Sequence, residues 1–64
     1  MSDKEILEII KNKRHSCYCD YECNIRLNMT DDNILSRQAR KDHIKGLIAN
    51  LKVYDELISM LESN

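Results

Sequence analysis

Four side chains able to bind a metal ion lie within nine residues of one another: His15, Cys17, Cys19 and Cys23. Zinc takes Cys thiolates and His nitrogens in tetrahedral sites, and a site with three Cys and one His is a known structural type. A bound metal would also supply the cross-link on which small chains often depend. The cluster therefore predicts a candidate zinc site, although it contains no Cys-x-x-Cys pair and no second pair of ligands follows.

The cysteines have two other interpretations. A free cysteine behaves as a small apolar side chain, so the three residues could simply face a core. With three cysteines in the chain, one disulfide could form and one thiol would be left over. The sequence leaves the zinc, core and disulfide or redox interpretations open.

Apolar and polar residues alternate almost without error from His15 to Met29. Such alternation is typical of a half-buried strand. We therefore expect an extended segment or tight hairpin over about 15–29, which would have to fold back on itself or pair with a second copy of the chain. The competing interpretation is a helix, in which Cys19 and Cys23 would lie one turn apart.

The polar positions of this segment include Asn24, Arg26 and Asn28, and helical sequence follows at once. Over about 24–61 this order resembles the ribbon-helix-helix DNA-binding proteins. The resemblance implies a dimer whose paired strands enter the major groove, where arginine pairs with guanine and asparagine with adenine. A basic patch follows, with four cations against Asp42 between positions 37 and 45, a local charge of +3. Its candidate nucleic-acid contacts are Arg37, Arg40 and Lys41.

The N-terminal residues predict a helix over about 3–13. Ser2 and Glu5 form a capping box, in which each side chain satisfies a free backbone N–H of the other residue. A helix of this length is unstable alone in water, so it must dock on another element.

The acceptor is an apolar stripe at heptad spacing near the C-terminus. It lies in a helical region over about 31–62, with Thr30 or Asp31 as the N-cap. One unbroken helix here would be about 48 Å long, more than a small monomer can cover. We therefore expect a homodimer, and slightly favour a break between 40 and 46, although no proline or glycine occupies 40–43. The predicted interface residues are Ile44, Leu47, Ile48, Leu51, Tyr54, Ile58 and Leu61.

The whole chain has 64 residues and a net charge of −1, which limits it to one small domain without an overall basic surface. Residues 1–13 mix charges with apolar residues, unlike a signal peptide, and no apolar run approaches the length of a membrane span. We find no phosphate-binding loop, nucleophile elbow or HExxH motif. We expect a mainly α protein in a reducing, cytoplasmic setting, with no cofactor unless zinc binds.

The sequence thus favours binding over catalysis. The predicted function is that of a small regulator, inhibitor or adaptor that occupies a macromolecular surface, most simply that of a protein. Its length and its Ile-, Asn-, Lys- and Asp-rich composition are typical of accessory proteins of phages and mobile elements. A dimeric DNA-binding regulator and a small structural zinc protein are the alternatives.

Overall fold

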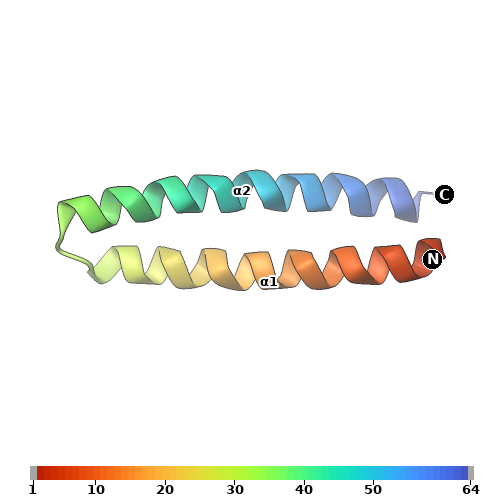
Figure 1. Ribbon diagram of the computed structural model, residues 1–64, viewed down its shortest axis with the longest axis horizontal. Coiled ribbons are helices and arrows are strands. Elements are labelled where there is room, and N and C mark those ends of the chain that lie inside the picture. Colours follow the sequence, from red (N-terminus) through yellow and green to blue (C-terminus); the bar gives the residue numbers. More distant parts are fainter. Residues whose placement is uncertain (1, 64) are drawn as a thin grey trace.

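A computed structural model describes residues 2–63 and contains two long helices. Helix α1 spans Asp3–Thr30, helix α2 spans Ile34–Glu62, and the two lie antiparallel along their full length (Figure 1). The hairpin measures 47 × 15 × 14 Å, and its radius of gyration is 14.8 Å. A compact domain of this length would have a radius of about 11 Å. The molecule is therefore a rod with a loop end and, where α1 begins and α2 ends, an open end.

Helix α1 begins as the sequence predicts. The backbone N–H of Glu5 donates to the Ser2 hydroxyl oxygen over 3.2 Å, which confirms Ser2 as the N-cap. The helix does not end near Lys13, however, but continues through the cysteine cluster to Thr30. The predicted extended or hairpin segment over 15–29 is therefore wrong, and residues 2–63 contain no strand.

The physical reason is that this segment fits two periods at once. Its alternation suits a strand, but the side chains at Cys17, Tyr21, Asn24 and Asn28 also recur every three or four residues, as a helix requires. A lone strand leaves a row of backbone groups unpaired, whereas a helix satisfies them within the segment. With no second strand in the described residues, the helical period prevails.

Three residues, 31–33, connect the helices. The Asp31 carboxylate accepts from the backbone N–H of Asn33 over 2.9 Å, and the Asn33 side chain accepts from that of Ser36 over 3.0 Å. Asn33, rather than Thr30 or Asp31, is thus the N-cap of α2, which begins three residues later than predicted. Arg40 Nη1 donates to the Asp31 carboxylate over 2.9 Å and to Asn28 Oδ1 over 3.3 Å, so a side chain of α2 holds the loop.

Helix α2 is continuous, so the slightly favoured break between 40 and 46 is wrong. Gly46 lies inside the helix, and a Cβ built there would meet nothing within 4 Å. The C-terminal stripe packs on α1 of the same chain. Because α1 has 28 residues and α2 has 29, one helix can run beside the whole of the other, and the length of α2 no longer requires a second chain.

The core is a single line of side chains between the helices, which we call the seam. On α2 it contains Ile44 and Leu47, each 7% exposed, and no other apolar residue of 2–63 is as deeply buried. The remaining positions are half-buried, because a two-helix rod covers each of them from one side only. They are Leu7, Ile10, Arg14, Cys17, Tyr21, Asn24 and Asn28 on α1, and Arg40, Leu51, Tyr54, Ile58 and Leu61 on α2.

Candidate functional site

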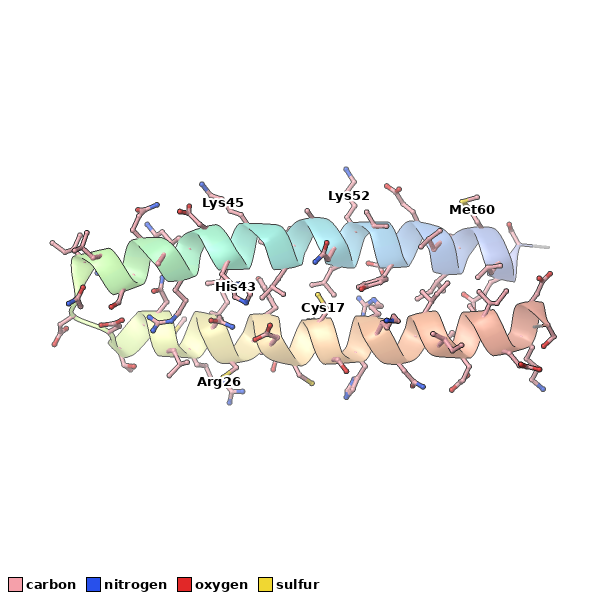
Figure 2. The ribbon with its side chains drawn as sticks, in the orientation of Figure 1. Cys17, Arg26, His43, Lys45, Lys52 and Met60 are labelled. Atoms are coloured by element: carbon pink, nitrogen blue, oxygen red, sulfur yellow. The ribbon has the colours of Figure 1, made fainter. Side chains whose placement is uncertain are left out.

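The four candidate zinc ligands do not converge. Cys17 points at α2, and its thiol donates to the carbonyl oxygen of Leu47 over 3.6 Å (Figure 2). Cys19 is exposed, with its sulfur 3.7 Å from Nε2 of His15, and Cys23 is exposed as well. Residues two apart on a helix point about 200° away from each other, so Cys17 and Cys19 lie on opposite sides. In residues 2–63 no group of three or more His, Cys, Asp or Glu side chains is arranged to hold a metal ion.

The residues of the DNA-binding hypothesis are separated too. Asn24 donates to the backbone and side-chain oxygens of Asp20, both over 2.8 Å, and Asn28 accepts from Arg40. Arg26 points away from α2 (Figure 2). Because the segment is helical, these side chains do not form the row along one strand face on which that hypothesis depended. Among the basic candidates, Arg40 is engaged in the loop, while Arg37 and Lys41 are exposed.

The predicted interface residues lie mostly inside the chain. Six of the seven belong to the seam and face α1. Ile48 alone lies outside it, and its side chain is 50% exposed. The element that covers most of the apolar stripe is the N-terminal half of the same chain, and a contact between chains stays a prediction.

Ion pairs flank the seam and fix how the helices face each other. Lys11 Nζ lies 3.3 Å from Oε2 of Glu62, and Arg14 contacts Asp55. His43 Nε2 lies 3.3 Å from Asp20 Oδ2. The hydrogen bond with Asp55 raises the pKa of the Arg14 guanidinium further above neutrality, so this seam residue stays charged. Along the sequence, Arg14 and Asp55 near the open end are 41 residues apart, and Asp20 and His43, nearer the loop, are 23 apart. Sequence separation falls towards the loop in this way in an antiparallel hairpin.

The most exposed large apolar side chains lie at the loop end. Met29, Ile34 and Leu35 are 79%, 80% and 82% exposed. We call these three residues the loop-end tip. From the sequence, Ile34 and Leu35 were expected within a helix but were not singled out. The available signal was the Ile-Leu pair in the first turn after a polar loop, where no neighbouring element can cover it.

Depressions in the surface of residues 2–63 include the following. Ile34, Arg37, Gln38 and Lys41 line one of about 160 Å³ beside the loop-end tip. A second, of about 710 Å³, follows the outer side of α2 near Ile48, Lys52 and Met60. The third, of about 440 Å³, lies between the helices. Polar residues (Lys13, Ser16, Asp20 and Asn50) line it together with Cys17, Leu47 and Tyr54. We call it the central groove.

Comparison with known proteins gives no family for this chain. No protein-family model matches it, and no curated protein or solved structure matches it either. Within residues 2–63, neither helix combines the length and the hydropathy that crossing a bilayer demands. The surface of the hairpin itself is therefore the basis for assigning a function.

Proposed function

We propose that this chain is a non-catalytic intracellular binding protein, a small regulator, inhibitor or adaptor that contacts a protein target through the loop-end tip. One observation carries the proposal: three large apolar side chains, at Met29, Ile34 and Leu35, remain about four-fifths exposed at one end of the rod. Single exposed apolar residues are ordinary, but grouped ones mark interaction sites. Aliphatic and Met side chains of this kind become well-packed anchors once a partner covers them.

Side-chain hydrogen bonds hold the loop backbone next to the tip. Asn33 caps α2, Asp31 closes the turn onto Asn33, and Arg40 joins the loop to Asn28. A surface that is already ordered loses little conformational entropy on binding. The loop contacts thus support recognition by a preformed structure.

The charges beside the tip indicate what kind of target fits. Arg37 and Lys41 are exposed and share one depression with Ile34. Cations around an apolar centre complement an apolar pocket with an acidic rim, and such charges mainly accelerate and orient association. We infer a protein target with that character. Its affinity would fall as salt screens the rim charges.

We also propose that the chain forms a homodimer. The support is its thin core, since only Ile44 and Leu47 are buried in residues 2–63, and small helical chains commonly gain the missing burial by association. The surface proposed below for the dimer contact does not include the loop-end tip, so each can be tested while the other is intact.

The target can be sought by site-specific cross-linking in cells of the source organism. A photoreactive amino acid at Leu35 should give a discrete cross-linked protein, whereas the same group at Ile48, an apolar site away from the tip, should not. The captured protein, once purified, should bind the chain in a salt-dependent manner. Leu35→Glu and Arg37→Glu should each weaken that binding by about ten-fold or more, a loss of roughly 1.4 kcal/mol.

The matched control for binding is Ile48→Glu, which makes the same kind of change away from the tip. It should leave the affinity unaltered. Helix content by circular dichroism verifies that each variant is folded. If Leu35→Glu and Ile48→Glu bind the captured protein equally well, the loop-end tip is not the binding surface.

A further inference from the structure

A second apolar stripe runs along the hairpin, one residue before each seam position. On α1 it contains Ile6, Ile9 and Leu27, and on α2 it contains Val53 and Leu57. The positions recur every three or four residues, as in the seam, but between Ile9 and Leu27 they are occupied by Lys13, Ser16, Asp20 and Cys23. Met60 has the same register on α2 but points away from α1 (Figure 2). The contact of Asp20 with His43, one from each helix, shows that the two halves of the stripe lie on one side of the rod. We call this side the second face.

The opposite side, one residue after each seam position, differs in charge. Seven positions of each helix lie one residue after the seam, between 8 and 29 on α1 and between 41 and 62 on α2. Eight of these fourteen residues are Lys, Asp or Glu. The fourteen positions of the second face lie between 6 and 27 on α1 and between 39 and 60 on α2. Two of them, Lys13 and Asp20, are Lys, Asp or Glu. Buried protein contacts have fewer charged residues than ordinary surface. On the second face the two charges lie near the middle of α1, and the apolar residues lie towards its ends. The second face is thus the side of the hairpin suited to association.

We propose that two copies of this chain pack through their second faces as an antiparallel four-helix bundle. This inference rests on the homodimer proposed above and names its contact. Charge complementarity is the first support. Lys13 and Asp20 both border the central groove and are seven residues, or about 10.5 Å, apart along α1. A two-fold axis midway between them brings each Lys13 opposite Asp20 of the second copy, as a self-complementary contact requires.

Shape is the second support. The large apolar side chains of the second face on α2, Val53 and Leu57, lie towards the open end, and both are partly exposed. Towards the loop end the same face of α2 carries the small residues Ala39 and Gly46 on either side of His43, and there is open space where a Cβ on Gly46 would be. The two-fold axis that pairs Lys13 with Asp20 also places the large half of each copy over the small half of the other. Leu57 of one chain therefore lies near Ala39 of the other, while Val53 lies near His43.

Charge and shape both favour a second copy over other occupants. Lys13 and Asp20 cancel in charge, which gives no attraction to nucleic acid or to an anionic membrane surface. A second copy that lies antiparallel presents an Asp20 opposite Lys13 and a Lys13 opposite Asp20 at the same spacing. Four-helix bundles of antiparallel hairpins bury such faces in a common core.

Charge exchange at the two positions tests the contact. Sedimentation equilibrium should show the unaltered chain as a dimer. Lys13→Asp would place two acids opposite each other, and Asp20→Lys two bases, so each variant should dimerise at least about ten-fold more weakly. An equimolar mixture of the two variants should restore association as a heterodimer, because at both contacts an acid of one variant then meets a base of the other. Lys45→Asp, which changes a residue that points away from α1, is the control and should remain dimeric (Figure 2).

A second pair of variants tests the apolar part. Val53 and Ile48 are 52% and 50% exposed on opposite sides of α2. Val53→Glu should dissociate the dimer and Ile48→Glu should not, while circular dichroism shows both to be helical. A monomeric unaltered chain would overturn the homodimer itself. A dimer that Val53→Glu leaves intact, or that the mixed charge variants fail to restore, would overturn only this face, and neither result would bear on the loop-end tip.

Discussion

At the open end of the hairpin the seam is apolar, and at the loop end it is polar. Leu7 and Ile10 face Ile58 and Leu61 near the open end, and all four are half-buried. Towards the loop, α1 places Asn24 and Asn28 on the seam, and α2 ends its stripe with Arg40. At the open end, removal of apolar surface from water acts together with the exposed Lys11–Glu62 and Arg14–Asp55 ion pairs. At the loop end the contacts are the hydrogen bonds and the ion pair of Arg40.

The difference separates stability from specificity. Apolar burial is non-directional, so the apolar positions of the seam stabilise the pairing without by themselves fixing its register. The bonds from Arg40 to Asn28 and Asp31 have defined geometry, and they form only when the helices are aligned around a three-residue loop. Polar seam positions in helical pairs commonly lower the stability of the pair but fix its register in this way. The seam is thus stabilised by its apolar positions, from Ile44 and Leu47 to the open end, and aligned by the bonds of Arg40 at the loop end.

The largest expected effect comes from the apolar part of the seam. Leu47→Ala removes one of the two buried apolar side chains and should cost about 2–5 kcal/mol, comparable with the whole stability of a chain this small. Thermal and urea melts followed by circular dichroism should show the variant largely unfolded at 25 °C. Leu35→Ala, the same substitution on an exposed side chain, should change stability by less than about 0.5 kcal/mol. Equal losses would show that the seam is not the core.

A medium effect of opposite sign is expected in the polar half. Asn24 bonds only to Asp20 of its own helix in the described contacts, so Asn24→Leu should add seam burial and stabilise the hairpin by about 1 kcal/mol. That gain corresponds to a rise of about 4–8 °C in Tm. Asn28→Leu should gain less or destabilise, because it removes an acceptor of Arg40. Identical gains at both sites would show that the Arg40 bonds contribute nothing.

The smallest effect concerns acid. A backbone hydrogen bond from Asn33, and then the bond from Arg40, hold the pKa of the Asp31 carboxyl below its ordinary value. A carboxyl whose folded pKa is depressed stabilises the fold above its unfolded pKa, near 4, and loses that contribution as the pH falls through the folded value. Asp31→Asn should therefore lose less stability than the unaltered chain below about pH 4, as measured by urea melts across pH. Asp32→Asn removes a charge from the neighbouring exposed position and should leave the acid dependence nearly unchanged.

Particular residues explain how far the sequence alone could lead. Ser2 and Glu5 indicated the start of α1, because a cap depends only on residues within one turn. The stripe from Ile44 to Leu61 indicated the seam, because most of its apolar residues recur at heptad spacing on one helical face. The loop-end tip and the second face were missed, since an apolar side chain reveals its exposure only when the neighbouring element is placed. The homodimer, its target and its function stay predictions.

What the sequence determined by itself was local: the start of α1, one apolar face and the absence of proline and glycine between 3 and 30. What only the tertiary structure decided was the state of 15–29, where Cys17, Tyr21 and their neighbours fit a strand and a helix alike. The α2 stripe needed a partner of its own length, and a 28-residue helix supplies one whereas a lone strand does not. Burial against α2 therefore selects the helix, and in doing so it turns Cys17 inward and Cys19 outward, which separates the cluster that first suggested a metal site.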